Sequence, residues 1–424
     1  MAMASRLNSA GLDRFSGSLN LVGRATGWFH LETIDGQAWL ITPEGHGFIS
    51  LGVNHLGHVF SPGQPANPEA IEAIRVNLQR GGYNTWGYDG PVPTDSTTPF
   101  VGSIMLTRTG HYHLGKDFCF DDVFDPKFQE TIRGKIRGYC GRVGQRANLI
   151  GYYWTDTPEW DIKLARKMRG TDWVSSLRTL GANTSGKVRY IDFLHQTYGG
   201  SIQAVNKAYG LQAPSFDWLI THDFNQLDLH RSEVQRDDEL FLQLIARELY
   251  RVTGEAFREF DPNHLLFGER YKMHLHPEVV LKEAMRYIDV LSIQPGPEVG
   301  AAHGPGKHES EFDGALFDRL HQLTGKPILI CDHSLSFYTP KYPKTLWNQY
   351  PTQRAAAYGI FLQAAMAKPY MIGFQRCQYI SVFKADRGHL KQGLVETNRK
   401  PHEEFLDLIG NANRKLLNQR YRER

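Results

Sequence analysis

Carboxyl groups follow two apolar runs of the sequence, at positions where a pair of them can perform acid–base chemistry. Asp156 and Glu159 come after the run Leu149–Trp154, and Asp332 comes directly after the run Pro327–Cys331. Hydrolysis of an acetal requires one protonated carboxyl that assists the leaving oxygen and one carboxylate on the opposite face of the sugar. An isolated acid more often caps a loop or pairs with an arginine. The prediction therefore depends on whether both runs bring their acids to one site.

Further polar and aromatic side chains follow the same and similar runs. Histidine, arginine and amide groups can hydrogen-bond to sugar hydroxyls or anionic groups, and flat aromatic faces can contact pyranose rings. Trp154, Trp160 and Tyr271 are the best placed for stacking, whereas Tyr153 and Phe374 lie within runs and are expected in the core. The predicted substrate-binding residues are Asn54, His55, Trp86, Tyr88, Arg108, Trp154, Trp160, Glu269, Arg270, Tyr271, His274, Gln294, His333 and Arg376.

Eight short apolar runs recur along the chain, and helical periodicity follows most of them. This alternation is typical of a parallel β/α protein. Because no G-x-G-x-x-G turn follows an early run, the pattern favours an α/β fold of the (β/α)8 TIM-barrel type over an open dinucleotide-binding sheet. The predicted strands are residues 47–53, 82–87, 101–106, 149–154, 264–268, 288–293, 327–331 and 370–374. Acids after the fourth and seventh strands then face each other across the mouth of the barrel.

The other segments are predicted to be helices or additions to the barrel. Periodicity and N-terminal proline predict helices over residues 67–80, from residue 125, over 188–209 and over 238–260. Residues 161–237 are too many for a simple loop, so we expect a helical insertion after strand four on the catalytic side.

The two ends of the chain flank a predicted catalytic domain of residues 47–412. Residues 1–46 alternate apolar and polar side chains around Asp35-Gly36, which predicts a β-hairpin that caps one end of the barrel. Residues 413–424 form a basic C-terminal tail that is expected to be a solvated helix end.

Composition excludes several classes of partner. The 424 residues carry 48 Lys and Arg against 45 Asp and Glu, a net charge of +3 that predicts no nucleic-acid partner. No run of 18 apolar residues predicts a membrane span, and the four cysteines show no CxxC spacing. The first residues lack an apolar signal core. We expect a soluble protein, cytoplasmic or, with a signal peptide removed, periplasmic or secreted, of undetermined oligomeric state.

Two histidine pairs, His111/His113 and His274/His276, have the alternate spacing that lets two strand residues ligate one zinc ion. Metal-dependent barrel hydrolases place such a pair after the first strand, where this sequence has Asn54-His55. The histidines are better interpreted as donors that line a polar or anionic cleft, so no metal or other cofactor is predicted.

Several motifs stand in an order found in a known family. Residues 39–54 read WLITPEGHGFISLGVN, residues 82–87 read GYNTWG, and residues 267–271 read FGERY. These motifs resemble the first, second and fifth strands of family 50 β-agarases. Residues 198–210, YGGSIQAVNKAYG, are similar to a helical segment of family 42 β-galactosidases, and Gly393-Leu-Val395 with Pro401 resembles the region after their eighth strand. Together the motifs cover most of the chain.

This resemblance implies a (β/α)8 barrel with a glutamate acid/base in an Asn-Glu pair after strand four and a glutamate nucleophile after strand seven. The sequence departs at both places, reading Asp-Thr-Pro-Glu at 156–159 and Ile-Cys-Asp at 330–332. We hypothesise that Glu159 is the acid, with Asp156 as its rival, and that Asp332 is the nucleophile or the base that activates water. Aspartate withdraws its carboxylate by roughly 1.5 Å relative to glutamate, so retention and inversion both stay open.

The sequence therefore predicts a glycoside hydrolase that cleaves a galactose-containing polysaccharide or oligosaccharide of algal type, sulfated or not. The galactose is implied by the resemblance, and the anionic alternative comes from the arginines and histidines near the strand ends. Two other classes stay open. One is a catalytically degenerate carbohydrate-binding barrel, and the other is a metal-dependent barrel hydrolase.

Overall fold

The computed structural model describes residues 11–60, 67–110, 115–156, 158–272, 276–295, 312–333, 350–384, 388–390 and 392–422. His111, His113 and His274 lie outside the described residues.

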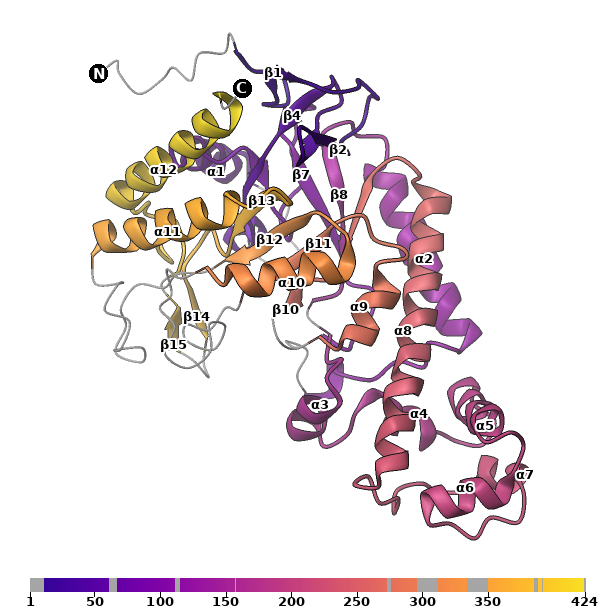
Figure 1. Ribbon diagram of the computed structural model, residues 1–424. Helices are drawn as coiled ribbons and strands as arrows, with labels where there is room; N and C mark the ends of the chain where they lie inside the picture. Colours follow the sequence, from indigo (N-terminus) through magenta and orange to yellow (C-terminus); the bar gives the residue numbers. More distant parts are fainter. Residues whose placement is uncertain are drawn as a thin grey trace.

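A sheet of parallel strands forms the centre of the molecule (Figure 1). Its order is β10 (Tyr271–Lys272), β11 (Leu291–Gln294), β12 (Ile328–His333), β13 (Met371–Arg376), β5 (Ser50–Val53), β6 (Thr85–Trp86), β7 (Phe100–Ile104), β8 (Leu149–Trp154) and β9 (Leu265–Gly268). Only Glu269 and Arg270 separate β9 from β10, which lie at the two ends of this order. The end strands are thus one interrupted strand, and eight parallel strands are present at the predicted places, as in a (β/α)8 barrel.

Helices follow the strands and cover the outer face of the sheet (Figure 1). They are α1 (Pro68–Arg80), α2 (Pro126–Val143), α8 (Ser232–Phe260), α9 (Glu278–Ala284), α10 (Gly314–Thr324), α11 (Pro351–Met366) and α12 (Glu403–Arg422). The helices predicted from residues 67 and 125 are confirmed. Asn67 and Asp125 cap them by accepting a backbone N–H with the side chain, and proline occupies the first helical position of each.

Two apolar clusters lie on the two faces of the sheet. One fills the inside of the sheet and includes Val101, Tyr153, Phe267, Leu329 and Ile372. The other lies between the strands and the helices and includes Leu51, Tyr152, Trp154, Ile330 and Phe374. Successive side chains of a strand point to opposite faces of the sheet. A residue at the end of a strand is therefore expected to face the mouth when it continues the inner cluster, and the helices when it continues the outer one.

A separate antiparallel sheet precedes the barrel. Its order is β1 (Ser18–Val22), β4 (His46–Phe48), β3 (Gln37–Ile41) and β2 (His30–Ile34), and β2 and β3 pair on either side of Asp35-Gly36, where the sequence predicts a tight turn. Phe29, Leu40 and Phe48 belong to the same apolar cluster as the inside of the barrel. The amide of Ala38 donates to the carbonyl of Pro369 (2.8 Å), just before β13 begins.

Shorter elements complete the described chain. The 3-10 turns η2 (Leu56–Val59) and η3 (Gly115–Asp117) follow β5 and β7, and β14 (Val382–Lys384) pairs with β15 (Gly388–Leu390). The predicted helix end after residue 413 is the last part of α12, but it is not fully solvated, because it buries Leu416 and Leu417. Arg420 in this helix donates to the carbonyl of Met366 (2.6 Å) and packs over the ring of Trp39.

Between β8 and α8 the chain forms α3 (Ile162–Arg169), α4 (Trp173–Arg178), α5 (Ser185–Thr197), α6 (Ile202–Tyr209) and α7 (Phe216–Thr221). In Figure 1, α5, α6 and α7 gather in a lobe at one end of the long helix α8. The single helix predicted over 188–209 is wrong, because the backbone at Gly199 and Gly200 has φ values of 59° and 75°. A helix cannot continue through that left-handed conformation, and Ser201 caps the new helix α6.

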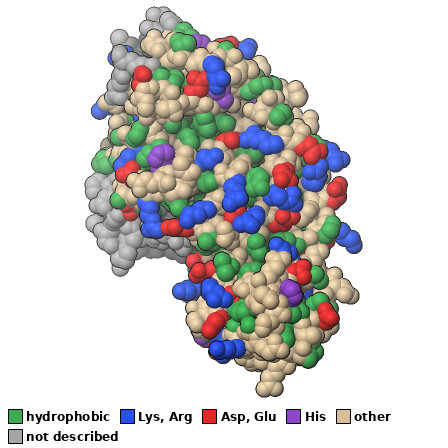
Figure 2. Space-filling model, turned by 45° about the vertical axis from the view of Figure 1, so that its right-hand side comes forward, with side chains coloured by type: hydrophobic (Ala, Val, Ile, Leu, Met, Phe, Trp, Pro, Cys, Tyr) green, Lys and Arg blue, Asp and Glu red, His purple; other side chains and the backbone are tan. Residues whose placement is uncertain are grey.

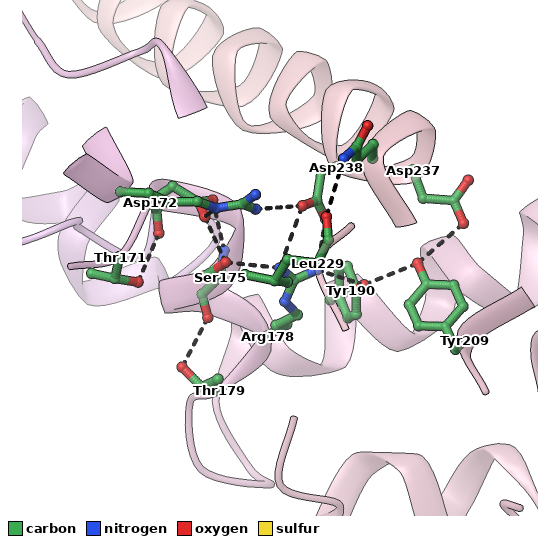
Figure 3. Close-up of polar contacts among 12 residues, drawn as sticks. Thr171, Asp172, Ser175, Arg178, Thr179, Tyr190, Tyr209, Leu229, Asp237 and Asp238 are labelled. Atoms are coloured by element: carbon green, nitrogen blue, oxygen red, sulfur yellow. Dashed lines mark hydrogen bonds and ion pairs between the residues drawn. The ribbon is translucent and has the colours of Figure 1, made fainter. Parts of the chain in front are cut away.

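A buried network of charges joins these helices (Figure 3). Arg178 Nη1 lies 2.6 Å from Asp238 Oδ1, and both side chains are almost fully buried. Arg166 contacts the second oxygen of Asp238 at 2.7 Å and also Asp172, which caps α4. Helices α3 and α4 are thus fastened to α8 by ion pairs, of which Arg178–Asp238 is almost fully buried and the Arg166 pairs are partly exposed.

Replacing Arg178 with methionine should lower the free energy of unfolding by about 3 kcal/mol, because the change leaves part of a buried carboxylate unpaired. Denaturant titration of the single variant and of the double variant with Asp238→Leu checks this. The double variant should be the more stable of the two, and equal losses in both would contradict the ion-pair explanation.

The surface over α2 and α8 carries charges of both signs. Figure 2 shows Lys and Arg next to Asp and Glu on this face, which includes the pairs Arg133–Glu259 and Arg251–Glu255. Among the described residues, no helix is both long and apolar enough to cross a membrane.

Candidate active site

Asp332 lies at the carboxyl end of β12, where a register shift between Ile330 and His333 interrupts the regular pairing with β13. Cys331 belongs to the apolar cluster inside the barrel, whereas His333 packs against Phe361 and Phe374 on the helix side. Regular alternation would put Cys331 and His333 on the same face. The irregularity instead turns His333 outward and leaves Asp332 at the mouth, as bulges near active sites commonly do.

Three donors from three other strands hold the Asp332 carboxylate. Asn54 Nδ2 donates to Oδ1 (3.2 Å), and the hydroxyl of Tyr88 donates to Oδ2 (2.9 Å). Arg270 Nη1 lies 3.4 Å from Oδ2. Asp332, Asn54 and Tyr88 are all buried, so the carboxylate is fixed in one orientation.

Arg270 joins the acids of strands four and seven. Its Nη2 lies 2.6 Å from Oδ1 of Asp156, while its Nη1 contacts Asp332. The guanidinium also packs over the ring of Tyr88, 3.5 Å from the centroid. Because one guanidinium contacts both carboxylates, their nearest oxygens are at most roughly 8 Å apart, which allows the retaining distance and the shorter part of the inverting range.

Glu159 pairs with a different arginine. Its Oε1 lies 3.5 Å from Nη2 of Arg169, whose guanidinium packs on Phe118 at 3.9 Å. Its backbone N–H donates to the carbonyl of Thr109 (3.1 Å), and the residue is buried. The rival acids therefore differ in their arginine partners. Asp156 shares Arg270 with Asp332, and Glu159 pairs with Arg169 of α3.

A chain of hydrogen bonds leads from Asp332 toward the surface. His55 contacts the Tyr88 hydroxyl through Nε2 (2.9 Å) and Asp89 Oδ2 through Nδ1 (2.7 Å). Burial lowers the pKa of His55 below its ordinary value and outweighs the hydrogen bond to Asp89, which raises it. Asp89, directly after Tyr88 in the sequence, and His58, three residues after His55, extend this chain although neither is among the predicted binding residues.

Cys377 is a further residue of the mouth that the sequence did not indicate. Its sulfur, a nitrogen of His55 and a carboxylate oxygen of Asp332 lie within 4.8 Å of one another. Burial and the charge of Asp332 raise the pKa of the Cys377 thiol well above its ordinary value. The thiol therefore stays protonated and is a poor nucleophile. Only the fold brings it here, since Cys377 lies 45 positions from Asp332 in a chain with no cysteine motif.

Glu269 and Arg270 are adjacent but point to different surroundings. Glu269 Oε2 accepts hydrogen bonds from Trp160 Nε1 (3.0 Å) and from the hydroxyl of Tyr250 in α8 (2.6 Å). Tyr271 donates in turn to the Tyr250 hydroxyl (3.2 Å). Burial raises the pKa of Glu269 to about 7. Glu269, Trp160 and Tyr271 thus form a buried cluster against α8, rather than the sugar-facing surface that the sequence suggested.

Five other predicted binding residues are not brought to the mouth. Trp86 and Trp154 belong to the layer between strands and helices, and Trp154 stacks on Phe257 of α8 at 5.3 Å. Arg376 donates to the carbonyl of Gln392, and His333 packs on α11 as described. Arg108 is exposed and lies 3.7 Å from Asp121. Strand alternation explains Trp86, Trp154 and Arg376, which occupy outward positions of their strands, whereas the register shift in β12 turns His333 outward.

Gln294 is brought to the inside of the barrel. Ser292, two residues earlier on β11, contacts the hydroxyl of Tyr153 in the inner cluster, so Gln294 faces the same way. It is fully buried, and its amide oxygen and nitrogen form no hydrogen bond among the described residues. Of the predicted binding residues, Asn54, His55, Tyr88, Arg270 and Gln294 are therefore those that surround Asp332 or face the barrel interior.

Comparisons with known proteins give the same fold. No family model matches the sequence, and no curated protein matches it. An exo-β-agarase of known structure superposes with a TM-score of 0.77 at 17% identity, covering 97% of this chain and 68% of the agarase. The agarase AgWH50C gives a TM-score of 0.74 at 16% identity, with the same coverage of both chains. A GH2 β-galacturonidase from Eisenbergiella tayi, bound to galacturonate, gives 0.52 at 12% identity, covering 91% of this chain and 54% of that enzyme. The chain is therefore agarase-like in its fold, as its motifs indicated.

Proposed function

We propose that this protein is a glycoside hydrolase that cleaves a galactose-containing polysaccharide or its oligosaccharides. The observation that carries the proposal is the position of Asp332. Its carboxylate is held by Asn54, Tyr88 and Arg270, and Arg270 also contacts Asp156, which follows β8. The agarase-like fold supports the same class of reaction.

In the proposed reaction, a carboxyl after β8 gives its proton to the leaving oxygen while the bond from that oxygen to the anomeric carbon breaks. Asp332 either attacks the anomeric carbon, forming a glycosyl ester that water later hydrolyses, or removes a proton from an attacking water. The donors on Asp332 keep its lone pairs directed at the sugar, and Gln294 offers a free amide to a hydroxyl.

Glu159 remains the proposed acid, with Asp156 as the alternative. Asp156 lies 2.6 Å from Arg270, which also contacts Asp332. Glu159 meets its arginine at the longer distance of 3.5 Å. The two are separated by measuring Glu159→Gln and Asp156→Asn on an aryl galactoside with a good leaving group and on a natural galactan. Loss of the acid should spare the aryl glycoside and remove most turnover of the galactan.

The proposed substrate class rests on the motifs shared with agarases and galactosidases and on Arg270 beside the mouth. Algal galactans, with and without sulfate, are therefore the first substrates to test. The protein is incubated with a panel of marine and plant galactans and galacturonides, and products are sized and examined by NMR for the newly formed anomer. Galactan oligosaccharides absent from an Asp332→Asn control support the proposal. Binding without any product would identify a carbohydrate-binding barrel instead.

Replacing Tyr88 with phenylalanine should lower kcat about 10- to 100-fold with a smaller change in KM, because Asp332 loses a donor that fixes its orientation. Steady-state kinetics of Tyr88→Phe and Tyr83→Phe checks this. Tyr83 is a buried tyrosine of the outer layer and serves as the matched control. An equal loss of kcat in both variants would indicate a general effect of the fold.

A further inference from the structure

A cluster of two histidines and one aspartate lies at the edge of the mouth. His55 Nδ1 and His58 Nε2 lie 2.7 Å and 3.1 Å from the same oxygen of Asp89. The two imidazole rings are stacked, with centroids 4.6 Å apart and planes inclined by 19°. The ligating atoms of all three side chains lie within 4.8 Å of one another. We infer that His55, His58 and Asp89 bind a divalent transition-metal ion, of which zinc is the representative probe.

The protons of the neighbouring hydrogen bonds argue for a cation at this point. Tyr88 has one hydroxyl proton, and it donates that proton to Asp332. His55 Nε2 must then carry a proton to bond to the Tyr88 oxygen, which leaves the Nδ1 lone pair of a neutral His55 facing the Asp89 carboxylate at 2.7 Å. The lone pair of His55 Nδ1 and those of the Asp89 oxygen repel each other. A metal ion bound to both atoms replaces this repulsion with two favourable contacts.

The surroundings match those of an open metal centre. A metal-bound histidine usually donates its second ring N–H to another group, and here His55 donates to Tyr88, which in turn holds Asp332. Two imidazoles and a carboxylate are a common ligand set for zinc with one position left for water or substrate. The side chains of His58 and Asp89 are 40% and 50% exposed, so an ion and a sugar oxygen can reach them.

The backbone holds the ligands in place before any ion binds. His55 and Asp89 adopt left-handed conformations, with φ of 56° and 55°, which few non-glycine residues adopt. Two backbone hydrogen bonds, from His55 to Tyr88 and from Gly57 to Asp89, join the loops after β5 and β6. These loops keep the two histidines and the aspartate together despite the strain.

A second cluster, Asp13, Glu44 and His46, serves as the internal comparison. It has one histidine, Glu44 lies 2.7 Å from Arg14, and Asp13 already accepts the backbone N–H groups of Phe15 and Gly17. Its donors and acceptors are thus satisfied by the protein. His46 provides a matched histidine variant in which zinc binding should not change.

The experiment uses the full-length protein, freed of metal by a chelator and titrated with zinc against a chromogenic competitor. We expect one zinc per chain, affinity at least about 100-fold lower in His58→Ala and in Asp89→Ala, and affinity within about threefold of wild type in His46→Ala. Zinc should also raise the Tm of wild type and His46→Ala, and not that of His58→Ala. Unchanged affinity in both His58→Ala and Asp89→Ala, or no stoichiometric binding by the wild type, overturns the inference.

X-ray absorption of the zinc-loaded wild type tests the ligand set without any variant. Two imidazole nitrogens with oxygen in the remaining positions support the site. A sulfur neighbour would place the ion at His55, Asp332 and Cys377 instead and overturn it. Both measurements are made without substrate, so their outcome is independent of the proposed glycosidase activity.

Discussion

Asp332→Asn should lower turnover of the true substrate by about 10³-fold or more while the affinity for the sugar changes little. The amide keeps the size and most hydrogen bonds of the carboxylate, but it can neither attack an anomeric carbon nor accept a proton from water. Asn54 and Tyr88 donate to different carboxylate oxygens, so one of these two donors still bonds to the single amide oxygen. The loss therefore appears in kcat, measured by product release, and binding is measured by calorimetry on the same oligosaccharide.

Asp289→Asn is the matched control. This aspartate lies at the amino end of β11, away from the mouth, and pairs with Arg258 while accepting the amide of Leu266. It should change stability more than activity. A kcat for Asp332→Asn close to that of wild type would show that Asp332 is not catalytic. Equal losses of kcat in both variants would indicate a general effect on the fold.

The positions of the eight strands could be predicted from the sequence because each strand is a short apolar run whose composition is visible locally. Two helix starts could be predicted for the same reason, since Asn67-Pro68 and Asp125-Pro126 carry their own capping groups. These features depend on neighbours in the chain and need no tertiary information.

The directions of side chains at the strand ends could not be predicted, because they depend on irregularities of the sheet. Asp332 reaches the mouth and His333 turns outward through the register shift in β12. Glu269 and Arg270 point to different surroundings because the fifth strand is interrupted at these two residues. Trp154 follows regular alternation and faces α8, so its position next to catalytic candidates in the sequence was misleading. A shift of one residue in a strand moves each of its side chains to the other face of the sheet. Strand boundaries predicted from a sequence are less accurate than one residue.

Glu269→Gln should raise the free energy of unfolding by about 3 kcal/mol at pH 8 and leave it nearly unchanged at pH 4. Burial raises the pKa of Glu269 from 4.5 to about 7, so the folded protein binds a proton there more tightly than the unfolded chain. Glu269 therefore contributes stability below about pH 4.5, and that contribution is lost as the pH rises through about 7. A shift of this size corresponds to about 3 kcal/mol.

The glutamine variant removes this dependence, because its carbonyl accepts the same hydrogen bonds from Trp160 and Tyr250 without a buried charge. Glu283→Gln is the control variant, for which the opposite change in stability is expected. Glu283 is equally buried but bonded to Arg247 and Gln243, which outweigh burial and lower its pKa, so its replacement should destabilise at pH 8. Denaturant titrations at both pH values distinguish the two glutamates. If Glu269→Gln lowered stability at pH 8 as Glu283→Gln should, the Glu269 carboxylate would be paired by a donor that compensates its burial.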